Sequence, residues 1–242
     1  MPTLNASKMG WKQSKAGKSR GSRAKMRYHV VDFNHIQTRV ITVRGTDPLD
    51  ALDILLDARL WVEDAMLTMA GILLPSITLW PDGLRSSMIQ VLASPQQLFN
   101  SPHLAALNFY ESGIKSIKKH QPPEGWKQVV TGHSLGGGLA GIVGAKLQLP
   151  SIAFSPPGLK FSRLKHGLRL RDLAQATILA PIRDPVPMID KQTGLVQHTN
   201  CIESSAVHCH LPQLMVCDLL QRCGDVGNRR FRGCSVTSKS IF

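Results

Sequence analysis

The chain has 242 residues, 43% of them hydrophobic, which is enough for one folded domain with a large core. Its formal net charge is +13. Its longest apolar stretch, from Ala65 to Trp80, is too short to span a membrane and is interrupted by Pro75. The first residues are too polar for a secretory signal peptide, so neither a leader nor a membrane anchor is predicted.

Much of the positive charge lies at the N-terminus. Residues 1–27 hold eight basic residues and no acidic one, with too few apolar residues to fold by burial. We therefore expect a disordered basic tail over 1–27, a folded domain over 28–225 and a second basic tail over 226–242. The N-terminal tail is either a solvated segment or a contact with an anionic membrane. No nucleic-acid partner is expected.

The predicted domain opens with a hairpin and a helix. Tyr28–Phe33 and Arg39–Arg44 are rich in β-branched residues and are separated by a turn, which predicts two paired strands. Apolar residues recur at helical spacing over Leu49–Met69, with aspartates on the other face, which predicts a helix with one solvated side. The apolar stretch Ala65–Asp82 has no clear period and is interpreted either as core or as a flap that meets lipid, with Trp61 and Trp80 at its interface.

Helices and strands alternate through the rest of the domain. A second amphipathic helix is predicted over His103–His120, and prolines separate it from a strand at Lys127–Thr131. Further strands are predicted at Ser151–Phe154 and Gln175–Leu179. This alternation predicts an α/β fold with a mostly parallel sheet.

The segment around Ser134 carries the clearest chemical signal. A β-branched run ends in Gly132-His133-Ser134-Leu135-Gly136, and a helix-forming run follows it to about Gln148. Strand, sharp turn and helix are the setting in which a Gly-x-Ser-x-Gly serine acts as a nucleophile. Gly132 and Gly136 suit a turn that leaves no room for a Cβ, and the first amides of the helix would face an oxyanion.

A serine nucleophile needs a base within hydrogen-bond reach and a third group to orient that base. On an α/β-hydrolase sheet the acid and then the histidine follow the serine along the chain. Asp184 is the best placed acid because it follows a predicted strand. The spacing leaves the base open among His198, His208 and His210.

All five cysteines lie in the last 42 residues. This clustering predicts disulfides, with one thiol left over. A metal site that combines cysteines with His208 and His210 is the alternative, but paired Cys-x-x-Cys spacing is missing. We expect neither a metal nor another cofactor.

Four motifs resemble the class 3 (fungal-type) lipases in their order along the chain. They are Val43-Arg44-Gly45-Thr46, Gly132–Gly138, Phe154–Gly158 and Asp184-Pro185-Val186-Pro187. The Ser-Pro-Pro-Gly piece is similar to that of sn-1-specific diacylglycerol lipases. Cys209-His210-Leu211 resembles the segment that carries the catalytic histidine in autophagy-related vacuolar lipases.

The resemblance implies an α/β-hydrolase fold and cleavage of carboxylic ester bonds in acylglycerols or related lipids. It implies Ser134 as nucleophile, Asp184 as orienting acid and His210 as base, with His208 and then His198 as substitutes. It also implies that the amides of Thr46 and Leu135 form the oxyanion hole. A lipid substrate at a membrane or droplet surface is expected, in a vacuolar, lysosomal or membrane-associated setting.

Two departures from the family leave a second interpretation open. Only the basic tail and one hairpin precede Arg44-Gly45-Thr46, where the family has an opening helical region, and no His-x-Gly element is recognisable between Asp57 and Asn100. An N-terminally truncated or inactive hydrolase fold that binds membrane lipid is therefore the alternative. A serine peptidase or short-chain esterase on the same fold is a third.

Overall fold

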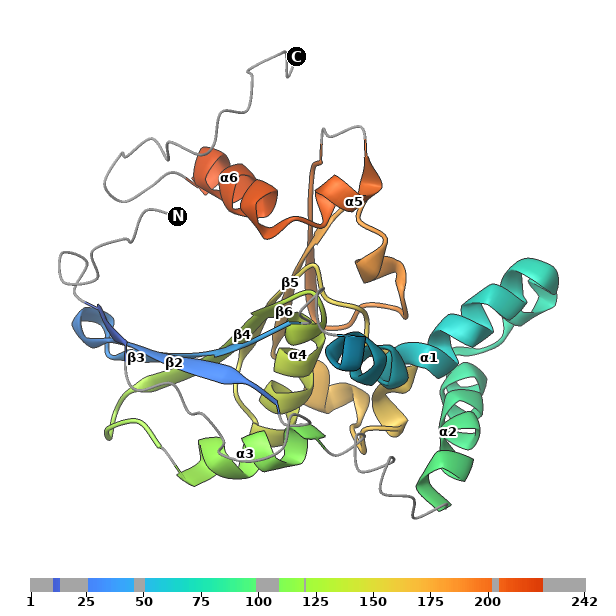
Figure 1. Ribbon diagram of the computed structural model, residues 1–242, viewed down its shortest axis with the longest axis horizontal. Helices are drawn as coiled ribbons and strands as arrows, with labels where there is room; N and C mark the ends of the chain where they lie inside the picture. The colour runs from blue at the N-terminus through green and yellow to red at the C-terminus, as the bar shows by residue number, and fades with distance from the viewer. Residues whose placement is uncertain are drawn as a thin grey trace.

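The computed structural model describes residues 11–13, 26–45, 51–98, 109–119, 121–201 and 205–223 (Figure 1). Its centre is a seven-stranded sheet whose strands lie side by side in chain order. The strands are β1 (Trp11–Gln13), β2 (Tyr28–Phe33), β3 (Thr38–Val43), β4 (Lys127–His133), β5 (Ser151–Phe154), β6 (Ala176–Pro181) and β7 (Leu195–Thr199).

The sheet is antiparallel at one edge and parallel elsewhere. β1 pairs antiparallel with β2 and β2 with β3, and each of β3 to β6 pairs parallel with the next strand. The predicted hairpin is confirmed, with Tyr28 opposite Val43 and Phe33 opposite Thr38. The mostly parallel sheet is confirmed as well. Because parallel strands end at the same edge, the loops after β4 and β6 meet at one end of the sheet.

Strand β1 lies inside the segment that the composition assigned to a disordered tail. Its three residues pair with Val31–Phe33 of β2. Backbone hydrogen bonds are enough for such an edge strand, so a segment too polar to build a core can still extend a sheet. The remainder of residues 1–25 and the predicted tail over 226–242 lie outside the described residues.

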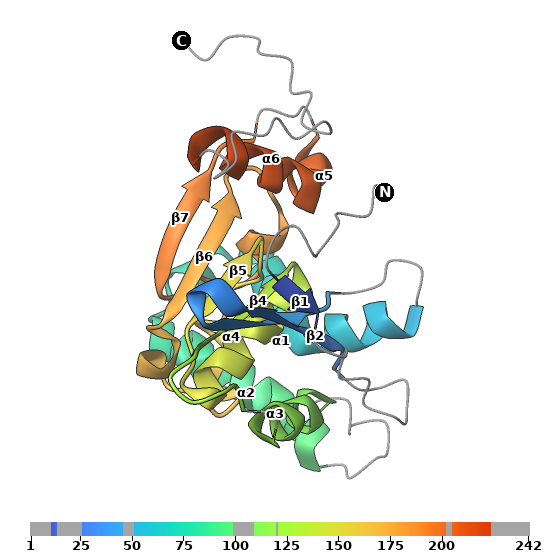
Figure 2. The ribbon, with the colours of Figure 1, turned by 90° about the vertical axis from the view of Figure 1, so that its left-hand side faces the viewer.

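The α-helices are α1 (Ala51–Leu73), α2 (Asp82–Leu98), α3 (Phe109–Lys119), α4 (Leu135–Leu147), α5 (Ala206–Cys209) and α6 (Pro212–Cys223). The two helices predicted from periodicity correspond to α1 and α3, and the helix predicted after Ser134 corresponds to α4. Helix α2 was not predicted, because Gly83, Ser86 and Ser87 lower the helix propensity of its first turns. Figure 2 shows α5 and α6 together beyond the ends of β6 and β7.

Helix α4 packs against the central strands. Residues 136–145 are all buried, and the many glycines and alanines let the helix lie close to the sheet. Its side chains share one core with Ile41 and Val130 of the sheet, Trp61 of α1 and Ile114 of α3. The other face is partly accessible in the described part of the chain, since Ile152 of β5 is 37% exposed.

The apolar stretch Ala65–Asp82 is core only in part. A 3-10 helix, η3 (Pro75–Leu79), connects α1 to α2, and they project from the sheet in Figure 1. Leu67 and Ile77 pack in a small cluster, but six apolar residues are exposed, with Leu73 at 82% and Leu79 at 85%. We call these six the apolar tip: Met66, Met69, Ile72, Leu73, Leu74 and Leu79.

The two tryptophans named for the flap do not belong to the tip. Trp61 is buried, and its Nε1–H donates to the Gly158 carbonyl at 3.0 Å. Trp80 packs against the small cluster of Leu67 and Ile77. Among the described residues, none of the helices has the length and hydrophobicity that crossing a bilayer requires.

Candidate active site

Ser134 stands at the turn between β4 and α4. Its φ is 58° and its ψ is −132°, a strained conformation for a residue with a side chain. A Cβ on Gly132 would collide with the Gly136 carbonyl, and a Cβ on Gly136 would lie 2.6 Å from Val43 O and Gly45 N. The expectation that both glycines are required by close backbone approach is therefore confirmed.

The start of α4 faces the end of β3. Leu135 is the first residue of the helix, where backbone amides have no carbonyl of their own helix to bond. Gly45, after β3, lies so close to the serine turn that a Cβ on it would be 2.9 Å from the His133 carbonyl oxygen. Thr46, the other expected oxyanion donor, lies outside the described residues.

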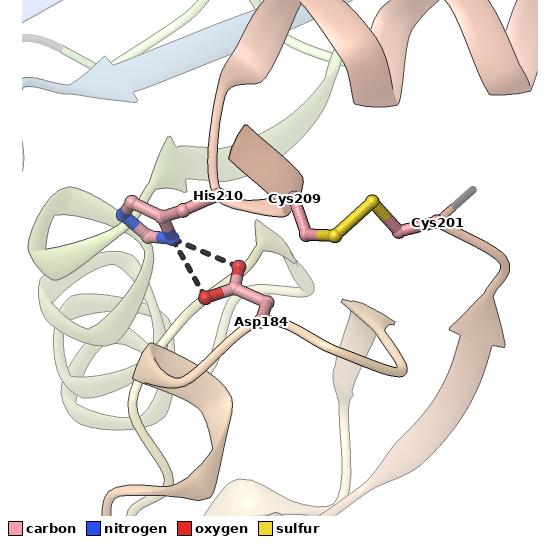
Figure 3. Close-up of a disulfide and its surroundings, with 4 residues drawn as sticks. All are labelled: Asp184, Cys201, Cys209 and His210. Carbon is pink, nitrogen blue, oxygen red and sulfur yellow. Dashed lines mark hydrogen bonds and ion pairs between the residues drawn. A yellow bond between two sulfur atoms is a disulfide. The ribbon is translucent and has the colours of Figure 1, made fainter. Parts of the chain in front are cut away.

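Asp184 follows β6 at the end of the sheet where Ser134 lies. Its side chain is fully buried, and its Oδ1 accepts the backbone N–H of Val186 at 2.9 Å. Its two carboxylate oxygens lie 3.0 and 2.8 Å from Nδ1 of His210, as the dashed lines in Figure 3 show. A carboxylate can only accept at neutral pH, so Nδ1 of His210 carries a proton.

The other nitrogen of the same ring meets the serine. Nε2 of His210 lies 2.8 Å from Oγ of Ser134. With its proton on Nδ1, the neutral ring has a lone pair on Nε2 that accepts the serine hydroxyl. The arrangement can remove a proton from Ser134 as its oxygen attacks an electrophile.

The structure distinguishes among the three candidate histidines. His210 is the C-cap of α5 and points to Ser134 and Asp184. His208 is exposed on α5, and His198 is exposed on β7. Neighbouring positions on so short a helix point in different directions, which spacing alone does not reveal.

The cysteine cluster forms disulfides, as predicted. Cys209 is bonded to Cys201, which lies just after β7, with Cα atoms 5.6 Å apart (Figure 3). Cys217 is disulfide-bonded as well. Among the described residues, no three or more His, Cys, Asp or Glu side chains are arranged to hold a metal ion.

One further histidine belongs to the site and was not predicted. His133, directly before the serine, places its Nε2 2.9 Å from the backbone carbonyl of His210. The two rings lie 4.8 Å apart. Burial lowers the pKa of His133, and the neighbouring His210 lowers it further. The sequence offered only the position of His133 within the Gly-x-Ser-x-Gly motif.

Three solved structures of fungal origin are similar to the chain. The first, a mutant of MDLA from Penicillium cyclopium, has 15% identity and a TM-score of 0.46, over 82% of this chain and 67% of that one. Lip2 lipase from Yarrowia lipolytica has 12% identity and a TM-score of 0.41, over 78% of this chain and 65% of that one. Lipase from Rhizopus microsporus var. chinensis has 16% identity and a TM-score of 0.40, over 78% of this chain and 61% of that one.

This chain therefore spans about two thirds of the length of these structures or less. No protein with a curated description matches it. A family model, Lipase (class 3), matches residues 40–151. This match covers most of β3, the turn at Ser134 and all of α4. Segment 40–151 is thus similar to the class 3 lipases, which confirms the resemblance predicted from the motifs, and the mostly parallel sheet with flanking helices agrees with the predicted α/β-hydrolase fold.

Proposed function

We propose that the protein is a serine hydrolase that cleaves carboxylic ester bonds of acylglycerols or related lipids. The observation that carries the proposal is the hydrogen-bonded chain Asp184–His210–Ser134, with its proton positions fixed by the carboxylate at one end. Its support is the geometry of these three residues together with the family match over 40–151.

The geometry supports a two-step acyl transfer. His210 takes the proton of Ser134 as Oγ attacks the ester carbonyl carbon, and the resulting oxyanion is stabilised by the amides of Leu135 and Thr46. His210 then returns the proton to the departing alcohol oxygen as the carbon–oxygen bond breaks. Water attacks the acyl-enzyme with the same base, which releases the acid and restores Ser134. Asp184 stabilises the charged ring of His210 in both steps.

Three exposed apolar side chains that are near Asp184 and His210 in the sequence favour an apolar acyl group as the substrate. Ile182, Val207 and Leu211 lie within three residues of Asp184 or His210 and are 55%, 68% and 43% exposed. Exposed apolar groups of this kind are covered by a ligand more favourably than by water.

The apolar tip supports contact with a lipid surface. No charged residue occurs over 65–81, so the exposed side chains of the tip can enter an apolar phase without desolvating a charge. The basic N-terminal tail lies almost wholly outside the described residues, and its contact with anionic lipid stays a prediction.

The test is hydrolysis of long-chain diacylglycerol and triacylglycerol, with labelling by a fluorophosphonate as a second measurement. We expect Ser134→Ala to abolish labelling and to lower turnover by about 10⁴-fold or more. His210→Ala should lower turnover and labelling as Ser134→Ala does, whereas His208→Ala should keep the wild-type rate. Turnover that survives Ser134→Ala contradicts the proposal, and absence of both turnover and labelling in the wild type favours an inactive lipid-binding fold.

A further inference from the structure

We propose that His133 is a positioning residue that holds the base His210 through its backbone carbonyl. The inference rests on the proposed hydrolase function, and it assigns a role to a side chain outside the Ser134–His210–Asp184 set. The contact that carries it is the 2.9 Å hydrogen bond between Nε2 of His133 and the carbonyl oxygen of His210.

The His210 carbonyl needs a partner because it lies at a break between two helices. In a continuous helix it would accept the N–H of Leu214, but that N–H donates to Leu211 O at 3.1 Å. Pro212, the first residue of α6, has no N–H to offer. A carbonyl that is partly withdrawn from water is stabilised by a hydrogen-bond donor, and the His133 ring supplies that donor.

The chemistry of the partner fixes the tautomer of His133. A carbonyl oxygen only accepts, so the proton of the neutral ring is on Nε2 and the lone pair is on Nδ1. This is the opposite tautomer from that of His210, whose proton is on Nδ1. The two rings of the site therefore have different and separately measurable states.

The bond joins the nucleophile turn to the base at two points. Ser134 Oγ meets the His210 side chain at 2.8 Å, and the preceding residue meets the His210 main chain at 2.9 Å. The second bond does not change as the proton moves from serine to histidine, so it can hold the distance between the two groups through the reaction. Because a displacement of about 1 Å costs about 100-fold in rate, such a tie has a kinetic consequence.

The short distance between the two rings also favours a neutral His133. The ring of His210 becomes positive when it takes the serine proton, and a second cation with its centroid 4.8 Å away would oppose that step. Burial lowers the pKa of His133 and so favours the neutral ring at pH 7. The hydrogen bond from His133 therefore positions His210 without adding a positive charge that would oppose protonation of the His210 ring.

The experiment compares His133→Leu, which removes the donor, with His133→Gln, whose amide N–H can reach the same carbonyl. The control is His29→Leu, because His29 is exposed on β2. We expect His133→Leu to lower kcat and the rate constant of fluorophosphonate labelling by about 100-fold, with KM changed less than about threefold. His133→Gln should have a kcat and a labelling rate constant at least about tenfold higher than those of His133→Leu. Both values for His29→Leu should equal those of the wild type.

Two further measurements separate a positioning role from an effect on stability alone. Labelling stoichiometry gives the folded fraction of each variant, so a rate lost only by unfolding is recognised. Nitrogen NMR of the wild type should show His133 neutral at pH 7 with its proton on Nε2, whether or not the protein turns over an ester. A wild type without turnover or labelling overturns the proposed function, whereas a wild-type rate in His133→Leu or a proton on Nδ1 of His133 overturns this inference.

Discussion

Cys209 is bonded to Cys201 and directly precedes His210, so a covalent link to the end of β7 holds the segment that carries the proposed base. Cys209 is buried and Cys201 is half-buried. Together with the contact from His133, the segment is held from two sides, by a disulfide on the β7 side and by a hydrogen bond on the β4 side.

Removing this disulfide should therefore lower both stability and activity. For the double variant Cys201→Ala/Cys209→Ala we expect the free energy of unfolding to fall by about 2–3 kcal/mol, as for other loops of about nine residues. We also expect kcat to fall at least about tenfold at a temperature where the variant is folded, because His210 gains freedom. Denaturant unfolding and active-site titration measure the two effects. An unchanged kcat would show that the disulfide stabilises the fold without positioning the base.

Close backbone approach at Gly136 makes a second prediction. A Cβ there would lie 2.6 Å from backbone atoms of Val43 and Gly45, which cannot move without disturbing β3. We expect Gly136→Ala to lower the free energy of unfolding by about 3 kcal/mol and to reduce activity, since it shifts the first amides of α4 away from Ser134. Circular dichroism with denaturant and ester turnover would measure this.

Gly83 provides the matched control. It lies in the first turn of α2, where an added Cβ meets nothing within 4 Å. Gly83→Ala should raise the free energy of unfolding by about 0.5–1 kcal/mol and leave turnover unchanged. Equal effects of the two substitutions would contradict the packing argument.

The parts of the site that depend on local sequence could be predicted. The turn at Ser134 needs a strand, two small residues and a helix within a short segment, and these leave a direct pattern in the sequence. The strand Ser151–Phe154 was predicted with the bounds that the structure has. The acid could be narrowed to Asp184 because it follows a strand, which places it at the end of the sheet that carries Ser134.

The base and its supports could not be predicted from residue patterns alone. The choice between His208 and His210 depends on how α5 meets the sheet, and β7, which leads to that helix, was not predicted. Its residues include Gln197 and His198, and three of its five side chains are exposed, so it lacks the apolar run of a buried strand. The contact of His133 with a carbonyl 77 residues away leaves no periodic signal.

Asp64 of α1 gives a prediction on pH. Burial raises the pKa of this carboxyl to about 7, and the neighbouring Asp190 adds to the effect, while Arg85 opposes it and Glu63 contributes least. The folded protein therefore keeps a proton that the unfolded chain loses near pH 4. The stability that this proton confers is present below about pH 4 and is lost as the pH rises through about 7.

Asn mimics the protonated carboxyl, so Asp64→Asn should remove this dependence. We expect the variant and the wild type to be about equally stable at pH 4, and the variant to be the more stable at pH 8 by about 4 kcal/mol at most. Denaturant unfolding at a series of pH values measures the difference. A difference that stays constant from pH 4 to pH 8 would show that Asp64 titrates like a solvent-exposed carboxyl.

The apolar tip makes the last prediction. Leu73 and Leu79 are its most exposed side chains, and burial of each in lipid would contribute about 1.5–3 kcal/mol. We expect Leu73→Asp/Leu79→Asp to weaken binding to neutral phosphatidylcholine vesicles at least about tenfold. Turnover of long-chain diacylglycerol in such vesicles should fall with it, whereas turnover of a soluble short-chain ester should stay within about twofold of the wild type.

The matched control adds the same charge elsewhere. Ile36→Asp/Val216→Asp changes two exposed apolar residues on η2 (Asn34–Ile36) and α6, and it should bind vesicles like the wild type. Salt distinguishes membrane binding through the tip from binding through the basic tail. Insertion of apolar side chains survives 0.5 M NaCl, whereas attraction of the tail to anionic lipid is screened. If Leu73→Asp/Leu79→Asp binds normally and salt abolishes binding, the tail holds the protein at the membrane and the tip does not.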